Sequence, residues 1–244
     1  MTKPVVWITR TPDGARGTAK AIQALGGEPI LAPVLKVVPL KPIIDPHSFD
    51  AVILTSRNGL NAFHAIVGRR SITAWCVGEA TAEAARAANY QSVVVANGDV
   101  EALTRLIIAT ADQHTRLFYA APKEPAGDLA GDLRQAGFLV REAAVYETRP
   151  MLPTLHPADM ARMTHVLIHS AKAGRAVAAV LKAQRDRFPL DKMCFVCISE
   201  SAWGGLEHAL EQGRAEDEKN ISPSRLIRRI SPFPDEASML KLID

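Results

Sequence analysis

The chain has 244 residues, of which 48% are hydrophobic and 23% charged, and this composition excludes a disordered or low-complexity chain. No apolar run reaches the roughly 20 residues of a spanning helix, and the first ten residues have too short an apolar stretch for a secretory signal. The net charge of +3 is too mild to indicate nucleic acid but is compatible with an anionic small molecule.

The first predicted elements are a strand at residues 5–8, a helix that ends near Gly26, and a second strand at 28–36. The same order recurs with a strand at 117–120, a helix that ends near Gly137, and a strand at 138–146. In the first helix an apolar stripe predicts the buried face, formed by Ala15, Ala19, Ile22 and Leu25. The strands are continuously apolar, as parallel strands covered on both faces must be.

Further segments repeat in the same order. Residues 51–59 are echoed by 165–174, and residues 76–82 by 197–202. A final pair matches 99–103 with 235–240. Because several units recur in order, we interpret the chain as a duplication of one α/β domain.

Two proline-rich stretches, residues 33–46 and 146–157, interrupt the alternation at equivalent places in the two repeats. Proline disfavours helix, so we expect extended connectors between two lobes. Two arrangements fit the pattern: two contiguous domains, or a swap in which the first strand-helix-strand of one repeat completes the sheet of the other. Periodicity does not choose between them.

Small polar and basic residues follow the predicted strands. The hydroxyl residues are Thr55, Ser56, Thr81, Ser170, Ser199 and Ser201, and the basic residues are Arg10, Arg57, Lys123 and Lys172. The plainer explanations are helix caps and solvated surface charges, but ligands of open parallel sheets bind at this edge. No G-x-x-x-x-G-K-[ST] motif is present and no G-x-G-x-x-G follows the first strand, so we predict a polycarboxylate ligand rather than a nucleotide.

Several other motifs are better explained structurally. Cys194 and Cys197 have redox or zinc spacing but face opposite sides of a predicted strand, so no metal site is expected. Three cysteines without framework spacing agree with a reducing, cytoplasmic location. The basic run 225–230 lacks interleaved aromatic residues and predicts an edge strand, preceded by a polar loop at 214–224.

Tyr146 lies where the second strand of its repeat enters the connector. We expect its phenol to face the mouth between the lobes, where it can donate a proton to a leaving hydroxyl, although it could instead pack against the connector. Tyr146 is the predicted catalytic residue.

Together these motifs resemble the uroporphyrinogen-III synthase family. The resemblance rests on Ile8-Thr9-Arg10, Leu54-Thr55-Ser56-Arg57-Asn58-Gly59, Val77-Gly78-Glu79-Ala80-Thr81-Ala82, Val145-Tyr146-Glu147-Thr148 and His169-Ser170. The chain departs from the family at Ser199-Glu200-Ser201, where relatives usually carry glycine and threonine. Glu200 would repel a polycarboxylate unless it turns away.

The resemblance implies the swapped arrangement, with two flavodoxin-like domains and a ligand cleft between them. One domain would comprise residues 1–35 plus 153–244 and the other 38–147, joined by connectors at 36–37 and 148–152. The implied reaction is a cofactor-independent, cyclising hydro-lyase step. Hydroxymethylbilane, a linear tetrapyrrole polycarboxylate, loses water and closes with its last ring inverted, and Tyr146 aligns with the family's proposed proton donor. A monomer with transient contact to the upstream deaminase is also implied, without nucleic acid or membrane.

Two other classes of protein share part of this pattern. A non-catalytic, two-lobed binding protein or sensor for an anionic small molecule would share the lobes, but such proteins are commonly exported. A phosphoacceptor domain needs an aspartate at the carboxyl end of a strand, whereas Asp50 precedes its strand.

Overall fold

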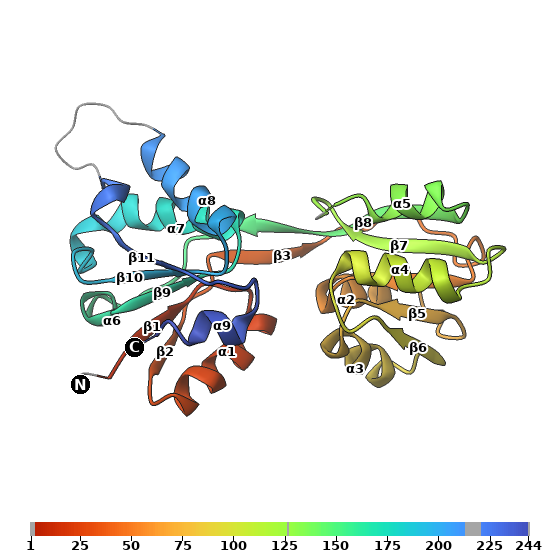
Figure 1. Ribbon diagram of the computed structural model, residues 1–244, viewed down its shortest axis with the longest axis horizontal. Coiled ribbons are helices and arrows are strands. Elements are labelled where there is room, and N and C mark those ends of the chain that lie inside the picture. Colours follow the sequence, from red (N-terminus) through yellow and green to blue (C-terminus); the bar gives the residue numbers. More distant parts are fainter. Residues whose placement is uncertain (1–2, 126, 213–220, 244) are drawn as a thin grey trace. The chain divides into compact units, whose positions relative to one another are not determined.

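Strands and helices alternate along the chain in the computed structural model, which describes residues 3–125, 127–212 and 221–243 (Figure 1). The strands are β1 (Val5–Ile8), β2 (Glu28–Leu31), β3 (Leu35–Pro39), β4 (Ala51–Leu54), β5 (Thr73–Cys76), β6 (Ser92–Val95), β7 (Arg116–Pro122), β8 (Leu139–Pro150), β9 (His165–Ile168), β10 (Cys194–Cys197) and β11 (Ile227–Ile230). The helices are α1 (Pro12–Ala24), α2 (Arg57–Ile66), α3 (Glu79–Ala87), α4 (Val100–Thr110), α5 (Leu129–Gln135), α6 (Pro157–Arg162), α7 (Ala171–Gln184), α8 (Glu200–Glu211) and α9 (Glu236–Leu240), with 3-10 turns η1 (Arg185–Arg187) and η2 (Pro223–Arg225).

These strands form two sheets with related orders, β11-β10-β9-β1-β2 and β3-β8-β7-β4-β5-β6. When the strands of the first sheet are numbered in chain order, they read 2-1-3-4-5 across the sheet, which is the flavodoxin-like order. In the first sheet β1 runs parallel to β2 and β9, and β10 runs parallel to β9 and β11. In the second sheet β4 runs parallel to β5 and β7, β5 to β6, and β7 to β8. The prediction of an α/β fold with two mostly parallel sheets is confirmed.

The described residues divide into two compact units. Unit 1 joins Met1–Lys36 to Arg149–Asp244, and unit 2 is Val37–Thr148. Strands β1 and β2 therefore complete the sheet that contains β9, β10 and β11. The two segments that pass from one unit to the other, β3 and β8, are neighbours and run antiparallel. Met151 N–H donates to Val34 O at 2.9 Å and Leu40 N–H to Val145 O at 2.8 Å, so the partner number falls as the residue number rises.

In unit 1 the sheet has a core on each face, and successive strand residues alternate between them. Trp7 packs with α7 and α8 on one face, whereas Val6 and Ile8 pack with α1 and α9 on the other. Figure 1 shows these two helix layers on either side of the sheet. The alternation places Cys194 and Cys197 in different cores, which confirms that they face opposite sides of the strand.

Unit 2 repeats this layering. Val52 and Phe118 pack with α2 and α3, and Ile53 and Tyr119 pack with α4 and α5 on the other face. Helices cover both faces of the sheet. The strand residues that remain uncovered are therefore those at the carboxyl ends, where each strand leads into a helix.

Some boundary predictions are confirmed and one is wrong. Gly26 and Gly137 end α1 and α5 with positive φ angles of 79° and 94°, which glycine adopts without a Cβ clash. Leu25 was expected on the buried stripe, but it is 59% exposed because it lies at the C-cap, beyond the last helical turn. Strand β11 lies at the edge of its sheet, as predicted from the basic run. Most of the predicted loop, residues 214–220, lies outside the described residues.

Candidate active site

Three serines cap helices at the carboxyl ends of strands. Gly59 N–H donates to Ser56 Oγ at 3.0 Å, Ala173 N–H to Ser170 Oγ at 3.1 Å and Ala202 N–H to Ser199 Oγ at 3.3 Å. A cap of this kind stabilises a helix by about 1 kcal/mol, and it uses the serine oxygen as an acceptor. The hydroxyl proton of each serine is left to donate elsewhere. The helix-cap explanation and a ligand-binding role are therefore compatible.

Thr81 does not cap a helix, contrary to the prediction. Gly78 occupies the N-cap of α3 and has no side chain to accept a bond, while Thr81 N–H donates to Gly78 O at 3.1 Å inside the first turn. The Thr81 side chain is buried at 5% exposure. The prediction is wrong because Gly78 occupies the N-cap position at which the equivalent helix of unit 1 has Ser199.

Ser56 also contacts the predicted catalytic residue. The Tyr146 hydroxyl lies 3.0 Å from Ser56 Oγ, and the ring is 7% exposed within the core that α2 shares with the sheet. Gly59 allows α2 to lie close to the β7 backbone, because a Cβ on Gly59 would lie only 3.1 Å from Ala120 O, whereas its distance of 3.6 Å from Tyr146 Cε1 would be an ordinary contact. Tyr146 is thus packed into the core of unit 2, and its hydroxyl contacts Ser56 at the N-terminus of α2.

Sequence reasoning missed a second buried phenol in unit 2. Tyr119 of β7 is 3% exposed and lies in the core under α4 and α5. Burial raises the pKa of Tyr119, and the nearby Tyr146 acts in the same direction. The register of β7 against β4 pairs Tyr119 with Ile53, and strand periodicity alone does not give this register.

The predicted cations have partners within the chain. Lys123 Nζ lies 3.1 Å from Glu147 Oε2, and this carboxylate is nearly buried. Arg10 Nη1 lies 2.9 Å from Glu236 Oε2, and Glu236 also accepts a hydrogen bond from Thr18. These pairs neutralise charge that the sequence had suggested was available to a ligand. Arg57 begins α2 and Lys172 lies in the first turn of α7.

His169 follows β9 at the position equivalent to Thr55. Within the described part of the chain neither ring nitrogen has a hydrogen-bond partner, although both are buried. Burial lowers the pKa of His169 to about 4, and the nearby Arg10 guanidinium contributes. The imidazole is therefore neutral at pH 7.

A family model described as Uroporphyrinogen-III synthase HemD matches residues 17–210, more than half of the chain. The chain belongs to the uroporphyrinogen-III synthase family. The family is one of tetrapyrrole biosynthesis enzymes. The matched range includes the hydroxyl residues that follow the ends of β4, β9 and β10, namely Thr55, Ser56, Ser170 and Ser199.

A solved structure from this family has a similar fold. The uroporphyrinogen-III synthetase from Helicobacter pylori matches with a TM-score of 0.59 and 14% identity, over 99% of this chain and 98% of that chain. A mutant uroporphyrinogen III synthase from the extremely thermophilic bacterium Thermus thermophilus matches with a TM-score of 0.48 and 15% identity, over 98% and 96%. The first likeness supports the fold alone. No curated protein matches the sequence.

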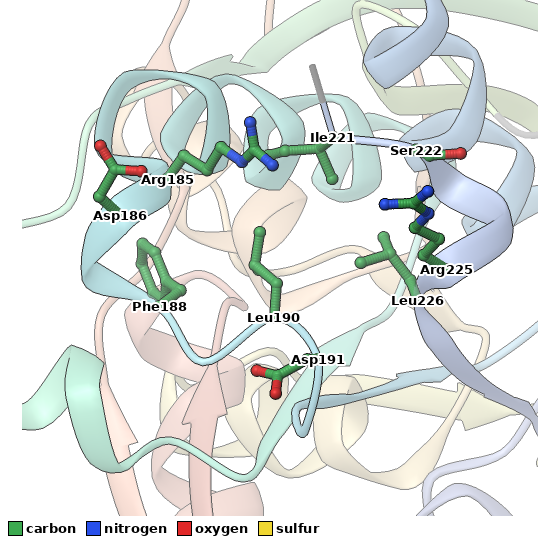
Figure 2. A pocket seen from close by; sticks show the side chains of 9 residues that line it. All are labelled: Arg185, Asp186, Phe188, Leu190, Asp191, Ile221, Ser222, Arg225 and Leu226. Atoms are coloured by element: carbon green, nitrogen blue, oxygen red, sulfur yellow. The ribbon is translucent and has the colours of Figure 1, made fainter. Parts of the chain in front are cut away.

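In this member of the uroporphyrinogen-III synthase family, one pocket lies away from the predicted site residues. It measures about 360 Å³ and is lined by Phe188, Leu190 and Leu226, with Arg185 and Arg225 at its sides (Figure 2). These residues precede β10 and β11 or follow α7, so the pocket lies at the amino edge of the sheet. None of the predicted site residues lines it.

The remaining predicted residues have plain positions. Ser201 and Glu200 are exposed in the first turn of α8, where a carboxylate interacts favourably with the helix dipole. Asp50 precedes β4 and binds the Arg116 guanidinium, with oxygen to nitrogen distances of 2.7 and 2.9 Å, so it is not at a carboxyl end. In the residues that the structure describes, no helix is long and apolar enough to cross a membrane.

Proposed function

We propose that this chain is a uroporphyrinogen-III synthase in activity as well as in family. It would convert hydroxymethylbilane to uroporphyrinogen III with loss of water and inversion of ring D, without a metal or organic cofactor. The observation that carries the proposal is the hydrogen bond between Ser56 and Tyr146 at the N-terminus of α2. It brings a proton donor, a second hydroxyl and a helix N-terminus to one point.

The hydrogen bond between Ser56 and Tyr146 is compatible with proton donation by Tyr146. Ser56 Oγ already accepts from Gly59 N–H, which orients the serine. If Ser56 then donates its own proton to the phenol oxygen, the phenolic proton of Tyr146 is left for an acceptor outside the pair. Such an acceptor would be the hydroxyl that leaves the bilane as water. The Ser56 hydrogen bond would also stabilise the phenolate that this transfer creates.

The rest of the reaction follows from the substrate. Once water leaves, an azafulvene cation attacks the substituted carbon of the last ring, and the resulting spiro intermediate fragments and recloses inverted. The proton lost when the macrocycle closes restores the phenol. Spontaneous closure gives the uninverted isomer, so the enzyme must above all hold the chain in one folded conformation.

Binding of a polycarboxylate would use the hydroxyls and basic residues at the strand ends. We propose Thr55, Ser56, Arg57, Thr81 and Lys123 as substrate-binding residues in unit 2, and Arg10, Ser170, Lys172, Ser199 and Ser201 in unit 1. The capped helices support this, because Ser56, Ser170 and Ser199 keep a hydroxyl proton to donate. Arg10 and Lys123 would have to share their charge with Glu236 and Glu147.

We also propose that residues 1–35 plus 153–244 and residues 38–147 are the two domains of a cytoplasmic monomer, which contacts the upstream deaminase transiently. The division of the described residues at Lys36, Val37, Thr148 and Arg149 supports these domains.

The experiment is to supply hydroxymethylbilane from a coupled deaminase and to separate the isomers of the product. Type III product above the spontaneous type I background is expected. A chain that bound the bilane but left the product wholly type I would instead be a non-catalytic binding protein for an anionic small molecule.

A further inference from the structure

The guanidinium of Arg10 is held by side chains from two helices of unit 1. Arg10 follows β1, and its Nη1 donates to Thr18 Oγ1 on α1 at 3.3 Å and to Glu236 Oε2 on α9 at 2.9 Å. The Thr18 hydroxyl in turn donates to the other carboxylate oxygen of Glu236. The three side chains thus form a closed ring of hydrogen bonds, which fixes the Nη1 end of the guanidinium.

The Thr18 hydroxyl is needed for this ring and not for the packing of α1. Thr18 lies inside the helix and is fully buried, at 0% exposure, where a valine would fill the same space. A helical threonine commonly bonds to the carbonyl four residues earlier, and Thr18 Oγ1 lies 3.2 Å from Gly14 O. The bonds to Arg10 and Glu236 are additional, and they join three segments that are distant in the sequence.

The packing of α9 against α1 fixes Glu236 in place. Met239 and Leu240 of α9 are buried in the core that α1 also covers (Figure 1). The side chains of Arg10 and Glu236 are 32% and 36% exposed, and an ion pair with this exposure contributes little to stability. The pair therefore orients the guanidinium more than it stabilises the fold.

Gly14 leaves the other side of the guanidinium clear. A Cβ on Gly14 would lie 2.7 Å from Nε of Arg10, 3.0 Å from Cζ and 3.2 Å from Nη2. The side that faces Gly14 is thus the one that bears Nε and Nη2. In the part of the chain that the structure describes, the guanidinium makes its hydrogen bonds through Nη1. Nε and Nη2 together can bind both oxygens of a carboxylate.

We propose that Gly14, Thr18 and Glu236 are positioning residues, which hold Arg10 so that its Nε and Nη2 are presented to one carboxylate of the substrate. This inference rests on the proposed function, in which Arg10 binds the polycarboxylate. The three residues touch no substrate, and their effect passes through Arg10. The Glu236 carboxylate lies at Nη1 and leaves Nε and Nη2 to the ligand. Loss of positioning would therefore weaken substrate binding and leave proton donation by Tyr146 in place.

A pair of glycine variants tests this on the full chain in the coupled assay. Gly14→Ala adds a methyl group against the guanidinium, whereas a Cβ on Gly17, in the same helix, would meet nothing within 4 Å. Alanine favours a helix at both positions, so neither variant should lose its fold. Gly14→Ala should raise KM by about three- to tenfold, the effect of one hydrogen bond, with kcat changed less than about twofold. Gly17→Ala is the matched control and should leave KM and kcat unchanged.

A double-mutant cycle separates positioning of Arg10 from a structural role of Thr18. Arg10→Met removes the guanidinium and should raise KM by about ten- to a hundredfold. Thr18→Val changes no charge and little volume, and it should raise KM by about three- to tenfold. Thr18→Ser keeps the hydroxyl and should raise KM less. Adding Thr18→Val to Arg10→Met should change KM by less than about twofold, because the guanidinium that Thr18 positions is gone.

Three results would overturn the inference while type III product from the wild type upheld the function. They are equal KM values in Gly14→Ala and Gly17→Ala, an unchanged KM in Arg10→Met, and an additive effect of Thr18→Val in the Arg10→Met background. If circular dichroism shows that Thr18→Val does not fold, the glycine pair decides alone. A wild type that formed only type I product would overturn both the inference and the function.

Discussion

Two neighbouring glycines of α8 test how α7 and α8 pack, and with them the position of the Ser170 and Ser199 caps. A Cβ on Gly205 would lie 2.2 Å from Ala171 O and 2.5 Å from Ala171 Cα, both backbone atoms of α7. A Cβ on Gly204 would meet nothing within 4 Å. The same methyl group, added one residue apart, therefore meets either a helix backbone or open space.

The two substitutions should change the free energy of unfolding in opposite directions. Gly204→Ala should stabilise the chain by about 0.5 to 1 kcal/mol, because alanine loses less backbone entropy in a helix. Gly205→Ala should destabilise it by about 1 to 3 kcal/mol or more, because backbone cannot yield as a flexible side chain does and the helices must move apart. We expect a difference of roughly 2 to 4 kcal/mol between the variants.

Urea unfolding followed by tryptophan fluorescence measures this difference. Trp7 and Trp203 are buried in the core that contains α7 and α8, so their emission reports on the packing concerned. The slope of the unfolding transition should be the same in both variants. A Gly205→Ala chain as stable as Gly204→Ala would refute the close packing of these helices.

Two further predictions concern buried titratable groups. The pKa of His169 is lowered from 6.5 to about 4 in the folded chain, so protons favour the unfolded chain as the pH falls from 6.5 towards 4. The free energy of unfolding should lose up to about 3 kcal/mol over this window, and His169→Leu should flatten the loss in urea titrations at several pH values. An equally steep loss in His169→Leu would contradict the burial of a neutral imidazole. Burial also raises the pKa of Cys76 and Cys197 to about 12, and that of Cys194 in the same direction. The native chain should therefore resist a thiol reagent at pH 7.5 and all three cysteines should react in urea, whereas rapid labelling of the native chain would show the thiols to be accessible.

The sequence predicted those features that depend on neighbouring residues. Continuous apolar runs identified the parallel strands, and serines after strands identified the caps, because both patterns are local. Ser56, Ser170 and Ser199 therefore stand where they were expected. The predicted helix cap at Thr81 is wrong because the N-cap position is occupied by Gly78, which has no side chain to accept a hydrogen bond.

Contacts between distant residues could not be predicted in the same way. Arg10 and Glu236 are 226 residues apart, and their ion pair depends on α9 packing beside α1. The pairing of Tyr119 with Ile53 depends on the register between β4 and β7, which periodicity does not give. The hydrogen bond between Ser56 and Tyr146 likewise joins residues that are 90 positions apart in the chain.

The most direct test of the proposed chemistry compares Tyr146→Phe with the wild type in the coupled assay. Tyr146→Phe removes only the hydroxyl that contacts Ser56, so the fold should survive by circular dichroism while the rate of type III formation falls at least tenfold. Tyr90→Phe is the matched control and should form type III product at the wild-type rate, because Tyr90 is also buried in unit 2, at 6% exposure, and its hydroxyl has no partner in the described residues. Type III formation at an undiminished rate in Tyr146→Phe would contradict proton donation by this phenol.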